Sequence, residues 1–119
     1  MTPTLYGYAS VPGMDAAALP HMRRRLAAFA GRRGFALMDV FAVQRPGQRL
    51  GVWCELLWDC QVFGVHDIVI PSLSHMNPCE ALARFMCQDL AARIGGRVWI
   101  VGQRRPVVAP AEEVGVMAG

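Results

Sequence analysis

FALMDVFAV, residues 35–43, is the stretch of sequence that decides the fold class. Its apolar side chains follow one another almost without interruption, which is typical of a strand that is covered on both faces. A helix is predicted before it, from Asp15 or Leu19 to Arg33, because apolar residues recur there at the spacing of one helix face. Its inward-facing residues are expected to be Leu19, Met22, Leu26, Phe29 and Ala30. A helix followed by a buried strand indicates a parallel sheet.

The same alternation continues on both sides of this stretch. Further strands are predicted over residues 5–11, 66–70 and 97–101, and further helices over residues 50–63 and 78–94. The second helix is expected to turn Trp53, Leu56, Leu57 and Cys60 inward, and the third Leu82, Phe85, Met86, Leu90 and Ile94. Asn77 as N-cap, Pro78 at the first helical position and Glu80 predict the start of the third helix.

The sequence therefore predicts an α/β fold, a three-layer sandwich in which helices cover both faces of a mostly parallel sheet of about four strands. We expect the strand order 2-1-3-4, a folded core over residues 4–102 and a flexible tail over residues 103–119. In such sheets ligands bind where the strand order reverses, past the carboxyl ends of the strands. The loops at residues 10–13 and 71–77 should meet there, beside the loop that follows the second strand.

The composition excludes several classes of function. All 12 basic residues are arginine, so mechanisms that need a lysine amine are ruled out. The net charge of +3 is only mildly basic. No apolar run reaches the ~20 residues of a membrane span, and no secretion signal is present, so we expect a cytoplasmic protein without membrane contact. The four cysteines lack zinc spacing and are expected to be reduced core thiols, and neither a metal nor a cofactor is predicted.

The loops at the expected crevice contain candidate ligands for an anion. Arg45 and Arg49 offer guanidinium groups that match phosphate, and the two helices that start near Asp15 and at Asn77 point free N–H groups at the same rim. From these residues alone, the favoured interpretation is that they are ordinary turn and capping residues of a small domain. Ser10 and His75 suggest a nucleophilic pair, but neither loop offers an acid to orient the histidine except Asp15 nearby. The arginine clusters at residues 23–25 and 32–33 form either a solvated helix face or a surface for a nucleic-acid backbone.

Three segments resemble the catalytic domain of the serine recombinases, the resolvase/invertase family. LYGYASV at residues 5–11 resembles the G-Y-x-R-V-S strand of that family. RRGFAL at residues 32–37 resembles the passage from the first helix to the second strand, and DIVIPSLSHM at residues 67–76 resembles the V-V-V-x-x-L-D-R-L-x-R segment. The resemblance covers residues 4–102. It implies the same resolvase-type α/β fold.

The resemblance also implies that most of the catalytic apparatus is replaced. The family's first arginine falls at Ser10 and its nucleophilic serine at Pro12, which has no hydroxyl. The second motif places Ser74 at the aspartate, His75 at the next arginine and Pro78 at the last arginine. Arg49, or alternatively Arg45, retains the arginine of the loop after the second strand. In the family the serine attacks the DNA phosphodiester while arginines stabilise the phosphate charge.

The resemblance therefore implies a non-catalytic relative of the DNA recombinases rather than an enzyme. Such a protein would act by binding a DNA backbone, a protein partner or a second copy of itself, with Arg45, Arg49 and Asn77 as candidate phosphate ligands. Two alternatives remain open. One is a divergent recombinase that cleaves DNA strands with Ser10, and the other is an α/β module that binds an anion or small ligand.

Overall fold

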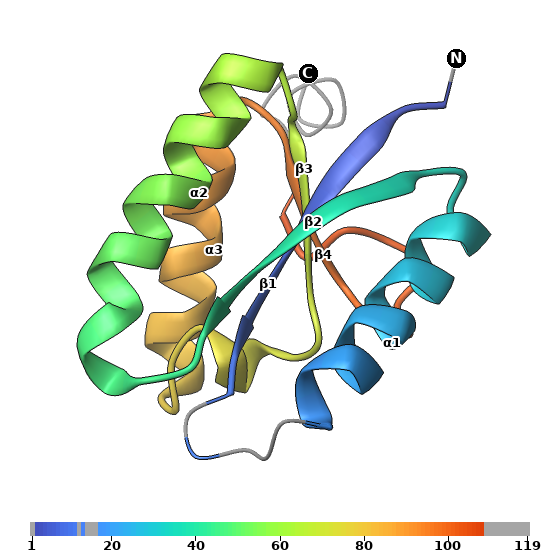
Figure 1. The fold of residues 1–119 in the computed structure, drawn as a ribbon. Helices are drawn as coiled ribbons and strands as arrows, with labels where there is room; N and C mark the ends of the chain where they lie inside the picture. The colour runs from blue at the N-terminus through green and yellow to red at the C-terminus, as the bar shows by residue number, and fades with distance from the viewer. Residues whose placement is uncertain (1, 12, 14–16, 109–119) are drawn as a thin grey trace.

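The computed structural model describes residues 2–11, 13 and 17–108 of the chain. In chain order the elements are the strand β1 (Thr4–Ser10), the helix α1 (Ala18–Arg32), β2 (Ala36–Val43), α2 (Arg49–Phe63), β3 (Asp67–Ile70), α3 (Glu80–Ile94) and β4 (Arg97–Ile100). Short 3₁₀ turns at Pro46–Gln48 and Leu73–His75 follow β2 and β3. Strand and helix alternate as the sequence predicts (Figure 1).

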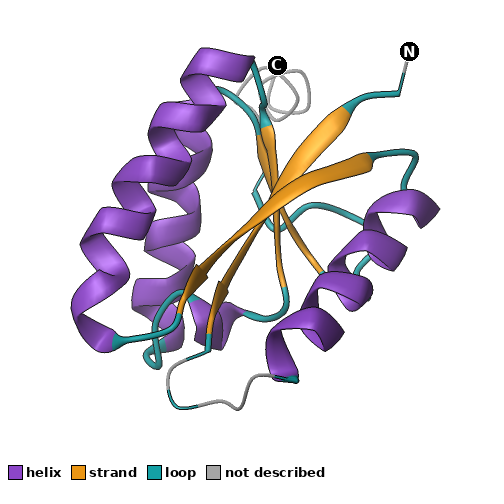
Figure 2. Ribbon diagram, in the orientation of Figure 1, coloured by secondary structure: helices purple, strands orange, loops and turns teal. Residues whose placement is uncertain are grey.

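The strands form one parallel sheet in the order β2-β1-β3-β4, which confirms the predicted topology. Helix α1 covers one face of the sheet, and α2 and α3 cover the other, so the chain forms three layers (Figure 2). Each face buries its own apolar cluster. Tyr8, Ile68 and Leu90 belong to the cluster under α2 and α3, while Leu26 and Trp99 belong to the cluster under α1.

Helix α3 differs from the prediction at its start and in its buried face. It begins at Glu80 with Cys79 as N-cap, and the Asn77 side chain instead accepts a hydrogen bond from the Cys79 N–H at 2.9 Å. Leu82 and Phe85, expected inside, are 53% and 64% exposed. The small residues Ala83, Cys87 and Ala91 face the sheet with Leu90 and Ile94. Small side chains let the helix approach the sheet closely, which the hydrophobic pattern alone does not indicate.

Strand β2 lies at an edge of the sheet and is only partly covered. Val40, Phe41 and Val43 are buried, whereas Met38 is 50% exposed and Asp39 is exposed. Leu5 pairs with Leu37 but Tyr6 pairs with Asp39, so Met38 is an extra residue that bulges out of the ladder. The expectation of a strand covered on both faces along its whole length is therefore wrong.

The other edge, β4, is covered by the chain itself. The Val107 N–H donates to the Val98 carbonyl at 2.8 Å, and the Val98 N–H donates to the Val108 carbonyl at 3.2 Å, in an antiparallel bridge. Val107 and Val108 also pack against the core, although they lie in the segment expected to be a loose tail. Residues 109–119 of that predicted tail lie outside the described residues.

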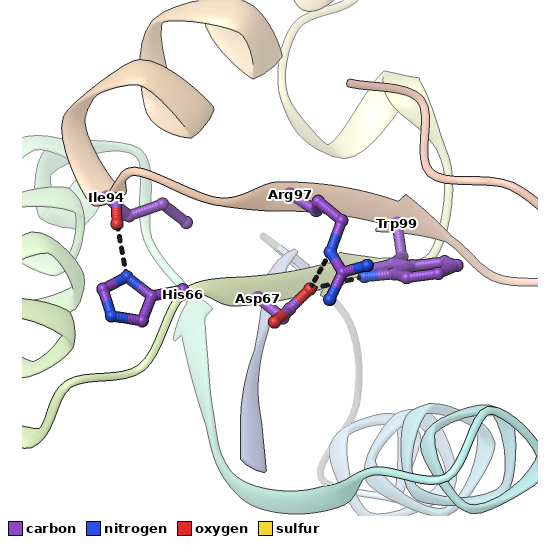
Figure 3. Close-up of polar contacts among 5 residues, drawn as sticks. All are labelled: His66, Asp67, Ile94, Arg97 and Trp99. Carbon is purple, nitrogen blue, oxygen red and sulfur yellow. Dashed lines mark hydrogen bonds and ion pairs between the residues drawn. The ribbon is translucent and has the colours of Figure 1, made fainter. Parts of the chain in front are cut away.

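The turn from α3 into β4 is packed tightly against the start of β3. The Nδ1 of His66 lies 2.7 Å from the Ile94 carbonyl, the last residue of α3 (Figure 3). A Cβ at Gly96 would collide with the His66 carbonyl, so this turn requires glycine. Cys60 and Cys87 are buried as expected, but Cys54 and Cys79 are exposed. No helix in the described ranges is long and apolar enough to cross a membrane.

Candidate functional site

The two loops predicted to meet at the reversal of strand order do meet. The backbone N–H of Ser10, the last residue of β1, donates to the Nδ1 of His75 at 3.0 Å. His75 ends the 3₁₀ turn that follows β3, so this hydrogen bond joins the carboxyl ends of the two central strands. The site therefore lies where the fold predicts a ligand-binding crevice.

The environment of His75 keeps its imidazole neutral. Partial burial lowers the pKa of His75, and the positive charge of Arg25 on α1 lowers it further. Only an unprotonated Nδ1 can accept the Ser10 N–H, so the neutral ring carries its proton on Nε2. His75 therefore has one N–H, on Nε2, with which it can donate to a ligand, and no positive charge while the ring accepts the Ser10 N–H.

Arg49 begins α2 and extends towards the same crevice. Its Nη1 donates to the carbonyl of Met76, the residue after His75, at 3.3 Å. Beneath it lies Tyr8 of β1, whose ring meets Trp53 edge-on at a centroid distance of 5.7 Å. Burial raises the pKa of Tyr8, and the charge of Arg49 partly opposes that rise. The guanidinium is therefore held in place at one end and lies beside the Ser10–His75 contact.

The remaining predicted site residues are dispersed around this centre. The hydroxyl of Ser74 is exposed and lies 2.8 Å from that of Ser72. Arg45 and Pro78 are exposed, and Asn77 uses its side-chain oxygen on the backbone of Cys79. Pro12 lies outside the described residues. The structure thus brings Ser10, His75 and Arg49 together and leaves the others at the margin.

Arg25 is the residue that the sequence did not assign to this site. It belongs to the arginine cluster at residues 23–25, for which the sequence predicts either a solvated helix face or a surface for a nucleic-acid backbone. Its charge nevertheless acts on His75. The predicted order of elements could have indicated this position. Helix α1 runs antiparallel to the strands, so its first turns lie at the carboxyl ends of the strands, beside the site.

The loops after β2 and β3 bring positive groups and no acid to the site. Residues 43–49 and 70–77, the loops after β2 and β3, contain no aspartate or glutamate. In the described part of the chain no three histidine, cysteine or acidic side chains gather as metal ligands. The described residues can therefore hold an anion through Arg49 and the His75 Nε2–H, but they offer no carboxylate to accept a proton.

An apolar pocket of about 420 Å³ adjoins Arg49. It lies between the start of α2 and the middle of α3 and is lined by Pro46, Gly47, Arg49, Leu50, Trp53 and Met86. Leu50 at its rim is 73% exposed. The cationic site thus continues into a surface that suits an apolar group.

No family model and no curated protein matches this sequence. Solved structures do match the fold. The N-terminal catalytic domain of TP901-1 integrase superposes with a TM-score of 0.68 at 12% identity, over 97% of this chain and 89% of that one.

Two further structures agree with this match. The C-terminal catalytic domain of ISC1926 TnpA, an IS607-like serine recombinase, gives 0.66 at 16% identity, over 96% of this chain and 77% of that one. A resolvase family site-specific recombinase from Streptococcus pneumoniae gives 0.69 at 14% identity, over 98% and 83%. The chain therefore has the fold of a serine recombinase catalytic domain, as its sequence resemblance implied.

Proposed function

We propose that this chain is a non-catalytic relative of the serine recombinase catalytic domain that binds the phosphate backbone of DNA at the carboxyl edge of its sheet. The observation that carries the proposal is the hydrogen bond from the Ser10 N–H to the His75 Nδ1. It places a neutral ring, which keeps an N–H on Nε2 to donate to a phosphate, at the two positions where the family resemblance expects arginines. A cytoplasmic location is part of the same proposal, because the ligand is DNA.

The lack of catalysis is supported by what the site residues already do. His75 uses one ring nitrogen on the backbone, and Arg49 uses part of its guanidinium on the Met76 carbonyl. The position expected for the nucleophile is Pro12, which has no hydroxyl. Loss of both a nucleophile and its charge-stabilising clamp removes most of the rate of a phosphoryl-transfer enzyme.

DNA binding is supported by the charge distribution. Arg25, Arg45 and Arg49 lie around a rim whose loops after β2 and β3 have no acid. A guanidinium fork matches a phosphate geometrically, and the His75 Nε2–H offers a further donor. Backbone phosphates are recognised by such groups without sequence specificity, so we expect binding that weakens steeply with salt.

Fluorescence anisotropy with a labelled DNA duplex tests the proposal. Arg49→Gln should weaken binding several-fold and reduce the slope of log K against log salt by about 0.9, the value for one phosphate contact. Arg93→Gln is the matched control, because Arg93 lies on the last turn of α3 and pairs with Asp89 at 2.8 Å. Absence of binding at low salt, or equal effects of the two substitutions, would contradict DNA binding at this site.

A supercoiled plasmid tests the lack of catalysis separately. The protein should produce neither nicks nor a covalent serine–DNA adduct after prolonged incubation. A reproducible adduct that disappears in Ser10→Ala would establish the alternative, a divergent strand-cleaving recombinase.

One observation favours protein binding as a second candidate function. The pocket beside Arg49 is bordered by Leu50 and by Met86 of α3, and the same helix also exposes Leu82 and Phe85. Large apolar side chains clustered on a small domain mark an association surface. Leu50→Ser, which adds no charge beside Arg49, should abolish a homodimer seen by analytical ultracentrifugation, or capture of a partner, while DNA affinity stays within about twofold.

A further inference from the structure

The two edges of the sheet are treated differently by the chain. Val107 and Val108 add an antiparallel segment to β4 and bond to both backbone groups of Val98. No comparable segment among the described residues covers β2, which crosses in front of the other strands in Figure 1. An open edge strand presents unpaired N–H and C=O groups to whatever approaches it.

The register identifies which backbone groups of β2 are open. The Val11 N–H donates to the Val43 carbonyl at 2.8 Å, so Val43 directs its backbone at β1. Residues alternate along a parallel strand, and Phe41 and Asp39 therefore point the same way as Val43. Val40 and Ala42 point their backbone groups outward, away from the sheet.

Side chains close the outer edge at both ends and leave its middle free. The Asp39 carboxylate accepts the Val40 N–H at 2.7 Å, and the Gln48 side chain accepts the Gln44 N–H at 3.3 Å. Between these two contacts lie the Val40 carbonyl and both backbone groups of Ala42. They form a short acceptor–donor–acceptor series, which is the pattern that an added β-strand satisfies.

A groove of about 240 Å³ runs along this open segment. Its floor is formed by residues 39–42 of β2 and by Gln44 in the loop that follows. One wall is formed by Leu19 and Arg23 of α1, and the other by Val52 and Glu55 of α2. Arg23 is already paired with Asp39 at 3.3 Å. Glu55 has no ion pair among the described residues, so one wall carries an uncompensated negative charge.

We propose that the outer edge of β2 binds an extended peptide of another protein as a fifth strand of the sheet. The peptide's backbone would pair with Val40 and Ala42. On one side its side chains would be aliphatic, against Leu19, and on the other they would include a lysine or arginine opposite Glu55. This proposal does not depend on DNA binding, because the groove and the Ser10–His75 site share no residue.

A second copy of the whole domain fits this groove poorly. Helices α1 and α2 both line it, so they stand on either side of the strand and confine the opening to a single extended segment. Pairing β2 with β2 of another copy would bring two such pairs of helices against one another. The geometry therefore favours a lone strand over a sheet edge.

The test uses a capped heptapeptide in which valine alternates with lysine and threonine, titrated into ¹⁵N-labelled protein. Binding should shift the Ala42 amide signal more than those of Phe41 and Val43. Two versions of the peptide, N-methylated on one or the other set of alternate amides, provide a matched control. One version should lose binding by roughly tenfold or more and the other should keep it, because only one set of amides faces β2.

Two variants of the protein complete the test. Ala42→Pro removes the outward N–H without touching the β1 ladder, so the protein should remain folded and lose the peptide. Glu55→Lys should reverse the preference towards a peptide with glutamate in place of lysine. Equal binding of both N-methylated peptides, or wild-type affinity in Ala42→Pro, would overturn the proposal. A protein dimer that Ala42→Pro dissociates would also overturn it, in favour of pairing between two copies.

Discussion

The carboxylate of Asp67 on β3 accepts a hydrogen bond from the indole N–H of Trp99 on β4 at 3.0 Å (Figure 3). The same oxygen accepts the Nε–H of Arg97 at 2.9 Å, and the Arg97 guanidinium lies over the Trp99 ring. Asp67 is only 7% exposed. Two partners on the neighbouring strand therefore compensate a buried charge on the α1 face of the sheet.

Removing the Asp67 carboxylate with Asp67→Ala should destabilise the protein more than replacing it by a neutral amide with Asp67→Asn. Asp67→Ala leaves a buried indole N–H without its acceptor and should lower the free energy of unfolding by about 2–4 kcal/mol. Asp67→Asn keeps an oxygen at the same place, so its cost should be about half as large. Urea denaturation followed by tryptophan fluorescence measures both, and equal losses would show that the acceptor geometry contributes nothing.

Stability should depend on His75 in weakly acidic solution. The pKa of His75 lies below 6.5 in the folded protein because of burial and the Arg25 charge, while the unfolded chain keeps the ordinary value. Between the folded and the unfolded pKa of His75, the unfolded state therefore binds more protons than the folded state. The stability that neutral His75 contributes is complete above pH 6.5 and is lost as the pH falls from there through the folded pKa.

His75→Asn should flatten the dependence of stability on pH. Asparagine still offers an oxygen to the Ser10 N–H but cannot titrate. Urea midpoints between pH 5 and 7 compare the two proteins, and NMR titration of the Arg25→Gln variant should show a raised His75 pKa. Identical slopes in wild type and His75→Asn would contradict the assigned role.

Two glycines should respond in opposite directions to the same substitution. A Cβ at Gly96 would overlap the His66 carbonyl, so Gly96→Ala must displace the turn between α3 and β4 and should cost about 2–4 kcal/mol. Gly31 lies in α1 with nothing within contact distance of an added Cβ. Gly31→Ala should stabilise the protein by about 0.5–1 kcal/mol. Thermal unfolding of the two variants side by side checks the contrast.

Only half of the cysteines should react in the native protein. Burial raises the pKa of Cys60 to about 12 and that of Cys87 to about 11, whereas Cys54 and Cys79 are exposed. Iodoacetamide at pH 8 should therefore modify Cys54 and Cys79 first, since the thiolate is the nucleophile. Peptide mass spectrometry before and after addition of urea distinguishes the two pairs. Equal labelling of all four in native protein would contradict the described packing.

The topology of this chain could be predicted from its sequence because alternating helical and strand periods leave few arrangements. Parallel connections are right-handed and helices must cover the sheet, so the order of strands and the meeting of Ser10 with His75 followed. The prediction for residues 35–43 was less accurate, because an apolar run at an edge looks the same as one at the centre. The bulge at Met38 has no sequence signature in a single chain.

The details of the site could be predicted only in part. Arg49 could be predicted near the crevice because it follows the second strand. Its contact with the Met76 carbonyl could not be predicted, because that contact depends on the path of the chain after β3. Arg25 was missed because its effect on His75 acts through space between α1 and a loop. For α3, Leu82 and Phe85 were expected inside because they are large, whereas the inner face belongs to Ala83, Cys87 and Ala91.

The antiparallel bridge between Val98 and Val108 has a consequence for how this domain can associate. A sheet with two open edges can pair with another molecule at each edge, and repeated pairing of this kind builds a fibril. Here β4 is terminated by the chain's own residues, and β2 is narrowed by its flanking helices. In the described part of the chain β2 is thus the one edge at which a strand can be added, so copies of the domain cannot be linked into a row through both edges of their sheets.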